Sequence, residues 1–343
     1  MQNNTLKKYT VIIISILKSG KSAAYYALLI KCLGLAMWPI DALLSILEKV
    51  FLPKERVASG PIVFVVGIHR TGSTYVSQVL SDVLDVTPIG NFFSVFPKSK
   101  YFIQFLGKAF FPFRKPQISK QNYYGISKGF YSIGDAYEIW DKWFGSDHYN
   151  TPKALTIKKK KEVLDYFYWV EKVWGKTLLC KNNRNSLAIK ELSLIFPDAY
   201  FVVVDRNPSD VILSTIRASK DFFGSTEHMW GLLPNKEFQD AKFENTATAY
   251  CSQYLGLEEE LNSQLSNLSQ SSYSRIRYEE FCIKPEQYIE EIIQSIKITQ
   301  GAEIGYNPAK LIVSNPGPSY QDVQLKKEIE QTLDILKNKQ LIN

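Results

Sequence analysis

The chain of 343 residues is 45 % hydrophobic and 13 % aromatic, which is ample for a large core and excludes a disordered protein. A formal charge of +7 suits an anionic ligand or a membrane surface, and without an arginine-rich tract or a nucleic-acid-binding motif we expect no nucleic acid partner. Four cysteines without a C-x-x-C pair and three scattered histidines predict no metal site and indicate reduced thiols in a cytoplasmic protein.

Residues 1–58 form an amino-terminal segment with a character of its own. Residues 11–17 are apolar except for one serine and are flanked by lysines, but no signal-peptide cleavage site follows. Residues 23–52 are rich in Leu, Ile and aromatics, but charged residues interrupt them, which argues against a spanning helix, and Pro39 predicts a break. Two interpretations of this amphipathic helical segment remain: helices that pack on the main domain, or a peripheral anchor in a membrane interface.

Residues 61–84, PIVFVVGIHRTGSTYVSQVLSDVL, predict a buried strand at 62–66, a glycine-bounded turn and a helix. The turn, GIHRTGST at 67–74, has the G-x-x-x-x-G-x-[ST] skeleton of a phosphate loop. In this loop Ser73 replaces the usual lysine, and Arg70 supplies a positive charge three residues earlier. A helix amino terminus still offers N–H groups to an anion, whereas ATP hydrolysis needs the missing lysine. We therefore predict a phosphate or sulfate site, with a purely structural turn as the alternative.

Residues 87–133 are irregular and rich in aromatic side chains. We expect this part, extending to about residue 150, to form a lid or an acceptor pocket rather than another layer of the sheet. An irregular hydrophobic subdomain without a ligand is the alternative. Asp135 and Glu138 follow among aromatic residues, one helical turn apart, so both could face one cavity. Aromatic surroundings would raise the pKa of either carboxyl toward neutrality, whereas a solvated pair on a helix face would have no such role.

Three further strands are predicted along the rest of the chain, at residues 176–181, 199–205 and 275–278. Helices are predicted at 185–196 with an Asn cap, after Pro208, after Pro285 and at 322–337. Strands that alternate with helices predict the fold class α/β. We expect a single doubly wound domain at 59–343, with a central parallel sheet, helices on both faces and a P-loop-like nucleotide site.

Arg206 stands at the carboxyl end of the predicted strand 199–205, where open α/β sheets place their ligand contacts. Asn207 is a natural cap for the helix that follows, and Ser214 lies eight residues after the arginine. A planar guanidinium and a hydroxyl are both suited to phosphate oxygens. The alternative is a salt bridge between Arg206 and Asp210 that serves the helix start alone.

The two loops together resemble the sulfotransferases that use 3′-phosphoadenosine 5′-phosphosulfate (PAPS). In that family a strand–loop–helix binds the 5′-phosphosulfate, and the pattern R-[ND]-P-x-[DE]-x-x-x-S binds the 3′-phosphate. This chain has GIHRTGSTYVSQVL and RNPSDVILS at the two places. The resemblance implies that PAPS is the co-substrate and that its 3′-phosphate is held by Arg206 and Ser214, with Tyr278 near the adenine. It assigns the 5′-phosphosulfate to His69, Arg70, Thr71, Gly72, Ser73 and Thr74. A plain core aromatic is the alternative for Tyr278.

The chain lacks the catalytic histidine motif and the R-K-G loop of the cytosolic branch, and it is more similar to the bacterial branch, in which carboxylates commonly serve as the base. The resemblance implies in-line transfer of a sulfuryl group to an acceptor hydroxyl, with Arg70 stabilising the leaving phosphate and no metal required. Asp135 is the first candidate for the base, Glu138 the second and His148 the third. The aromatic region and the amino-terminal segment favour a saccharide, glycolipid or lipid acceptor.

Two other functions fit part of the pattern. A P-loop kinase or NTPase would use Mg·ATP, but it lacks its lysine and would need Asp205 as the metal ligand. A nucleotide-binding or membrane-scaffold protein would keep the fold and lack the chemistry. Nothing in the sequence predicts the oligomeric state.

Overall fold

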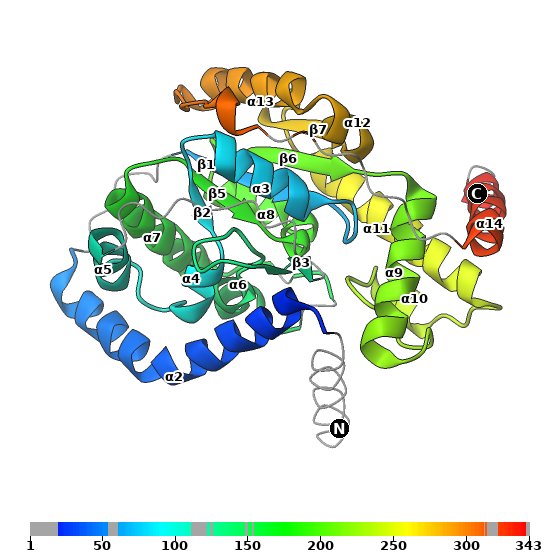
Figure 1. Cartoon of the computed structure of the whole chain (residues 1–343), viewed down its shortest axis with the longest axis horizontal. Coiled ribbons are helices and arrows are strands. Elements are labelled where there is room, and N and C mark those ends of the chain that lie inside the picture. The colour runs from blue at the N-terminus through cyan, green and yellow to red at the C-terminus, as the bar shows by residue number, and fades with distance from the viewer. Residues whose placement is uncertain are drawn as a thin grey trace.

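The computed structural model describes residues 20–53, 61–110, 122–123, 126–147, 150–152, 154–311, 313 and 322–340. At its centre, five parallel strands follow the order β2, β5, β1, β6, β7 (Figure 1). Their bounds are β1 (Ile62–Val66), β2 (Thr87–Ile89), β5 (Leu178–Lys181), β6 (Tyr200–Asp205) and β7 (Tyr273–Arg277). Because β1 lies between β5 and β6, its carboxyl end is a switch point of the sheet, where α/β folds bind ligands.

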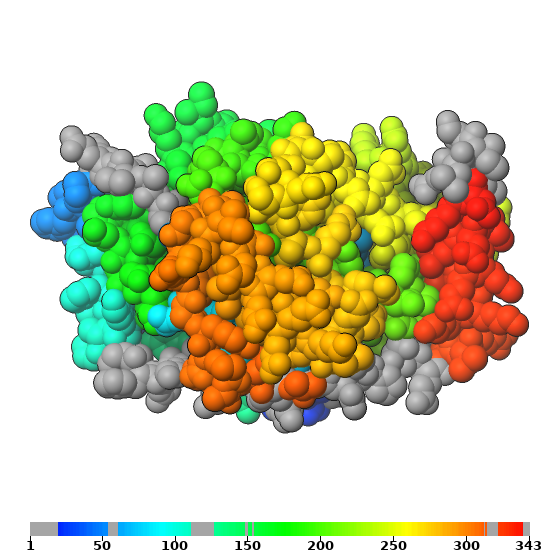
Figure 2. All heavy atoms as spheres, turned by 90° about the horizontal axis from the view of Figure 1, so that it is seen from above, coloured from blue at the N-terminus to red at the C-terminus, as the bar shows by residue number. Residues whose placement is uncertain are grey.

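Helices cover both faces of the sheet, and the side chains of each strand alternate between two cores. On β1, Val63 and Val65 join one core, while Ile62, Phe64 and Val66 join the other. The first face is covered by α3 (Ser73–Val83), α12 (Tyr278–Ile283) and α13 (Pro285–Gln300), and Figure 2 shows α13 in orange spread over it. The second face is covered by α6 (Tyr137–Phe144), α7 (Ile157–Trp174), α8 (Ile189–Ile195), α9 (Pro208–Phe223) and α11 (Thr246–Leu265). The predicted doubly wound α/β fold is confirmed.

The other elements surround this frame. They are α2 (Ser22–Phe51), α4 (Asn91–Val95), α5 (Phe102–Phe110), α10 (Lys236–Asp240), α14 (Val323–Gln340), the strand pair β3 (Asn122–Tyr123) and β4 (Ile126–Ser127), and 3-10 helices at Asn183–Leu187, Gln270–Ser272 and Pro308–Lys310. The predicted carboxyl-terminal helix is α14, which buries Ile329 and Leu333 in the second core.

The short edge strand β2 was not predicted, because the segment it occupies has the irregular pattern of a loop. It has only three residues, with Pro88 in the middle, and it pairs with β5 along one side. A proline cannot donate to a ladder, and it is tolerated in an edge strand for that reason. The aromatic part of the chain therefore begins inside the sheet, and Phe92, Phe93 and Phe96 are buried in the second core.

Two predicted elements differ from the structure by a few residues. The helix predicted at 185–196 is split into the 3-10 helix Asn183–Leu187, capped by Asn182, and α8. The split follows from Ser186, whose hydroxyl hydrogen-bonds to the backbone of Gly67 and fixes this segment beside the loop. The strand predicted to include Tyr278 ends one residue earlier, and Tyr278 begins α12.

The helix break predicted at Pro39 was also wrong, since α2 is continuous over 30 residues with Pro39 inside it. A proline inside a helix costs about 3 kcal/mol. Contacts with the domain on both sides of the proline offset this cost, because Ile30 is buried before it and Asp41 and Glu48 are buried after it.

Candidate active site

Four segments meet at the carboxyl edge of the sheet. They are the loop after β1, the 3-10 segment after β5, the turn after β6 and the first residue of α12 after β7. The four segments follow strands that are neighbours in the sheet, so residues far apart in the sequence come close together there. The two motifs found in the sequence are two of these segments.

The loop after β1 is shaped by two glycines. Gly67 has φ +150°, and a Cβ there would lie 2.6 Å from the carbonyl oxygen of Val204. Its amide donates to Ser186 Oγ and its carbonyl accepts from the same hydroxyl, both at 2.8 Å. Gly72 has φ +95°, and a Cβ there would lie 2.2 Å from the ring of Tyr278. The loop is thereby held against two neighbouring segments, with α3 starting directly after it.

The hydroxyl groups of the loop have defined partners. Thr71 Oγ1 donates to the carbonyl of Ile68 at 2.8 Å, inside the loop. Ser73 Oγ donates to Asn183 Oδ1 at 2.8 Å, which ties the first residue of α3 to the segment after β5. Thr74 is half-buried in the first turn of α3. The first turn of α3 contains no acidic residue, so its N–H groups and partial positive charge face no carboxylate of their own helix.

Arg70 joins the two predicted halves of the site. Its Nε donates to Ser214 Oγ on α9 at 2.8 Å, and its carbonyl accepts from Arg206 Nη1 at 3.3 Å. Arg70 has φ 69°, a left-handed backbone conformation that costs a residue with a side chain about 1–3 kcal/mol. The guanidinium also lies 5.8 Å from the centroid of the Trp230 ring. The structure thus brings together the residues expected at the 5′ and 3′ ends of one ligand.

Arg206 has a buried nitrogen that could take a ligand. Its guanidinium lies 5.0 Å from the centroid of the Tyr278 ring, and its Nε has no hydrogen-bond partner among the described residues. Asp210, the partner in the alternative interpretation, accepts instead from Lys326 Nζ at 2.9 Å. Tyr278 packs on Gly72 and on the first core, so it is both a core aromatic and a wall of the site.

The side chain of His69 is enclosed by a neighbouring segment. Its Nδ1 accepts from the amide of Leu232 at 3.3 Å, and Trp230 meets the ring edge-on at 5.6 Å between centroids. Burial, together with the charge of Arg70, lowers the pKa of His69 to about 3. The imidazole is therefore neutral, and only the backbone of His69 remains a candidate for ligand contact.

Asp135 lies at the site and is paired with a residue that the sequence analysis missed. Lys181, the last residue of β5, is 2 % exposed and its Nζ lies 2.8 Å from Asp135 Oδ1. The amide of Asn183 donates to the same oxygen at 3.4 Å, and Asn182 Nδ2 donates to the Asp135 carbonyl at 2.7 Å. The sequence gives one indication of Lys181, which is its position at the end of an apolar strand. Arg206 follows another apolar strand in the same way.

Glu138 has a different partner from Asp135. Asp135 precedes α6, whereas Glu138 lies in its first turn, so the two carboxylates are not related by one turn of a helix. Glu138 pairs with Lys31 of α2. Burial raises the pKa of Glu138, but the Lys31 ammonium and its hydrogen bond outweigh this and hold the pKa below its usual range. The third candidate, His148, lies outside the described residues.

Asp205, the metal ligand required by the kinase alternative, is paired with a cation. Its Oδ2 accepts from Arg275 Nη1 at 2.9 Å. Burial raises its pKa, against the opposing effect of Arg275. Within the described part of the chain, no group of three or more His, Cys, Asp or Glu side chains is arranged to hold a metal ion.

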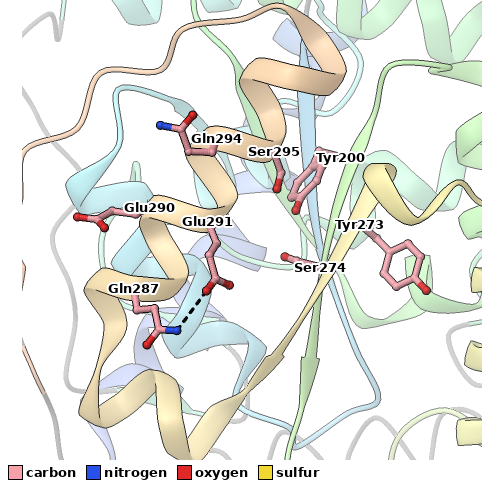
Figure 3. Close-up of a pocket in the computed structure, with 8 residues that line it drawn as sticks. All are labelled: Tyr200, Tyr273, Ser274, Gln287, Glu290, Glu291, Gln294 and Ser295. Carbon is pink, nitrogen blue, oxygen red and sulfur yellow. Dashed lines mark hydrogen bonds between the residues drawn. The ribbon is translucent and has the colours of Figure 1, made fainter.

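A separate hollow lies at the opposite, amino-terminal edge of β6 and β7, against α13 (Figure 3). Its volume is about 550 Å³, and it is lined by Tyr200, Tyr273, Ser274, Gln287, Glu290, Glu291, Gln294 and Ser295. It contains two carboxylates and no cationic side chain, which does not suit an anionic nucleotide. The candidate site is therefore the carboxyl edge.

Comparison with known proteins gives one family match. A model described as the sulfotransferase family matches residues 61–300. Similar solved structures include sulfotransferase STF1 from Mycobacterium tuberculosis, with 14 % identity, 96 % of this chain and 92 % of that chain covered, and a TM-score of 0.49. Sulfotransferase STF9 from Mycobacterium avium has 14 % identity, with 84 % and 70 % covered and a TM-score of 0.45. No curated protein matches the chain.

Proposed function

Because the chain belongs to the sulfotransferase family, we propose that it transfers a sulfuryl group from PAPS to an acceptor hydroxyl. The observation that carries this proposal is the contact of Arg70 with both Ser214 and Arg206. Two arginines and a helix amino terminus around one position suit a donor that has anionic groups at both its 5′ and 3′ ends. The buried Nε of Arg206 without a protein partner fits a phosphate oxygen in particular.

The residues divide the ligand between them in this proposal. The backbone of residues 69–72 and the hydroxyls of Ser73 and Thr74 would hold the 5′-phosphosulfate, together with Arg70. Arg206 and Ser214 would hold the 3′-phosphate, and Tyr278 would flank the adenine. PAPS supplies an activated sulfuryl group, and the chain needs no metal to bind it because arginine and helix N–H groups meet its charges.

The chain's own contribution to the reaction is charge stabilisation and proton removal. Arg70 and Lys181 would stabilise the negative charge that develops on the phosphate as its bond to sulfur breaks. Asp135 would take the proton of the acceptor hydroxyl while that oxygen bonds to sulfur. Lys181 Nζ lies 2.8 Å from Asp135 Oδ1 and holds this carboxylate in position. Glu138 is the second candidate for this role, and His148 the third.

We propose a saccharide, glycolipid or lipid hydroxyl as the acceptor, bound beside the aromatic region at about residues 87–150. Phe92, Phe93 and Phe96 belong to the core and are not available to it. Exposed aromatics beside α2, namely Phe105 and Phe110, are available. We also propose a cytoplasmic protein with peripheral membrane contact, in keeping with cysteines that are all free in the described part of the chain.

Calorimetric titration tests the donor. We expect 3′,5′-adenosine bisphosphate to bind without metal and Mg·ATP not to bind. Arg206→Ala should weaken bisphosphate binding by at least about tenfold, because a charged hydrogen bond is worth about 1.5–3 kcal/mol. The matched control is Arg217→Ala on the same helix as Ser214, since Arg217 is exposed and pairs with Asp221.

Preference for Mg·ATP would overturn the proposal. Bisphosphate binding without transfer of labelled sulfate to any acceptor would favour the non-catalytic alternative.

A further inference from the structure

The polarity of α2 is reversed from that of an ordinary surface helix. Its two carboxylates, Asp41 and Glu48, are 0 % and 1 % exposed, while large apolar side chains such as Leu43 and Val50 are 58 % and 72 % exposed. An ordinary amphipathic helix turns its charges to water and its apolar stripe to the core. Among the described residues, α2 is also the one helix long and apolar enough to cross a membrane, with a mean hydropathy of 1.7 over 18 residues.

The buried carboxylates fasten α2 to the domain. Asp41 accepts from the amides of Lys98 and Ser99, at 2.9 and 2.8 Å. Glu48 accepts from the Ser99 hydroxyl and from the amides that follow it, those of Lys100, Tyr101 and Phe102, at 2.6–2.9 Å. These residues lead into α5, so Glu48 also meets the partial positive charge of that helix. We name this set of contacts the carboxylate latch.

The opposite side of α2 presents a continuous apolar row. Exposed residues recur every three or four positions, at Cys32, Ala36, Pro39, Leu43, Ile46 and Val50. Leu35 beside this row is 78 % exposed. We name the row together with Leu35 the outer face. A patch of this kind on a soluble protein marks an interaction surface.

Cationic groups line one edge of the outer face, and no carboxylate of α2 does. Lys49 and Lys31, the latter paired with Glu138, are exposed and lie on the same side of the helix, 18 residues or five turns apart. Between them, Lys98 lies 4.0 Å from the centroid of the exposed Trp38 ring. Lysine and tryptophan beside an apolar stripe are the residues that meet the headgroup region of an anionic bilayer.

We propose that the outer face binds the surface of an anionic membrane without crossing it. To cross the bilayer, α2 would have to leave the domain and carry Asp41 and Glu48 from the carboxylate latch into hydrocarbon, which is costly. Lying in the interface, α2 buries its apolar row in lipid and keeps the latch. The exposed arc is also wider than the narrow stripe of a coiled coil, so a lipid surface covers it better than one partner helix. This inference is independent of the proposed reaction.

Vesicle sedimentation of the full chain tests the proposal. Vesicles of phosphatidylglycerol and phosphatidylcholine in equal parts should bind the wild type, and vesicles of phosphatidylcholine alone should bind it more weakly. The variant with Leu43→Glu and Val50→Glu should bind at least about tenfold more weakly, because both side chains would lose their burial in lipid. The matched control is Ile298→Glu, since Ile298 is 78 % exposed on α13, on the far side of the molecule from α2 (Figure 1). Thermal unfolding should be alike in all three proteins because the altered side chains are exposed.

Thiol labelling gives a second readout on the wild type. Cys32 is exposed on the outer face, and the other three cysteines are buried. We expect a water-soluble maleimide to label Cys32 in solution and to fail once vesicles are bound. Equal binding by the wild type and the Leu43→Glu, Val50→Glu variant would overturn the proposal. A wild-type dimer that this variant converts to monomer without vesicle binding would assign the outer face to a second copy. An unreactive Cys32 without vesicles would assign it to another part of the same chain.

Discussion

Arg70 keeps its side chain in a backbone conformation that glycine adopts more readily. In this conformation Arg70 donates to Ser214 and accepts from Arg206. Strain retained at a ligand loop is a sign of function, because nothing in stability selects it. We therefore compare two substitutions at this residue that remove the guanidinium but differ in strain.

We predict that Arg70→Gly is more stable than Arg70→Ala by about 1 kcal/mol, since only glycine relieves the left-handed strain. Both variants should lose sulfate transfer by about 10²–10³-fold, the usual effect of removing one charge-stabilising donor. Urea denaturation and a labelled-sulfate assay measure the two effects. Equal stability of the two variants would show that φ at this position carries no cost.

Asp135 is the second residue whose role can be separated from its position. Asp135→Asn should keep bisphosphate binding and lower turnover by about 10²–10⁴-fold, because the amide cannot take the acceptor proton. Asp85→Asn is the control, since Asp85 is exposed and pairs with Lys176 at the other edge of the sheet. Glu138→Gln should have the smaller effect, as Glu138 is committed to Lys31. Unchanged turnover in Asp135→Asn would remove it as the base and leave Glu138 and His148.

The neutral His69 makes a prediction about pH. Its pKa is about 3 in the folded protein against 6.5 for the ordinary side chain, so below pH 6.5 the unfolded chain binds a proton that the folded protein does not. The free energy of unfolding is lower at acidic pH for this reason, and it falls by up to about 1.4 kcal/mol per pH unit as pH decreases from 6.5 toward 3. The glutamine in His69→Gln can accept from the Leu232 amide but does not titrate. This contribution to the acid loss of stability should therefore be absent from the variant. Denaturation of both proteins at pH 7 and pH 5 provides the comparison, and parallel losses would contradict the assignment.

At the scale of elements, apolar runs predicted the strands that are buried on both faces. β1, β5 and β6 have such runs, and they were found because a parallel strand needs no alternation. β2 was missed because a short edge strand with a proline leaves no such pattern. The split between the 3-10 segment and α8 depends on Ser186 and Gly67, which are 119 residues apart, and no local signal records that contact. Lys181 ends an apolar strand and could have been noticed for that, but its contact with Asp135, which comes from another element, leaves no local pattern.

The carboxylate latch gives a prediction for the α2 element. Glu48→Gln removes a charge and turns one acceptor oxygen into a donor facing backbone amides, so we expect a loss of stability of about 1–3 kcal/mol. The control is Glu303→Gln, because Glu303 is an exposed carboxylate whose partner is the Lys297 side chain rather than a backbone amide. Chemical denaturation measures the loss, and hydrogen exchange should become faster at the amides of residues 98–102. A neutral Glu48→Gln variant would show that the latch does not hold α2.

At the scale of the whole molecule, α2 is connected to the candidate site through a short path. Lys31 of α2 pairs with Glu138 of α6, and Asp135 lies three residues before Glu138. A membrane-bound outer face would therefore hold the candidate site near the lipid surface, in keeping with the lipid or glycolipid acceptor that we propose. The nucleotide loops belong to β1 and β6, and the hydrogen bonds of Arg70 with Ser214 and Arg206 join them to each other, so donor binding and membrane binding should be separable.

This separation predicts a result that neither surface gives alone. Bisphosphate at about a hundred times its dissociation constant should stabilise the wild type by about 2.7 kcal/mol. The variant with Leu43→Glu and Val50→Glu should gain the same amount, because its nucleotide loops are unchanged. Arg206→Ala, with binding at least about tenfold weaker, should gain no more than about 1.4 kcal/mol at that concentration. Vesicle binding should be lost in the variant with Leu43→Glu and Val50→Glu and kept in Arg206→Ala. Denaturation with and without ligand, beside sedimentation of the same samples, measures both. If one substitution abolished both kinds of binding without unfolding the chain, the two surfaces would be one site, and the acceptor would reach the donor through α2 itself.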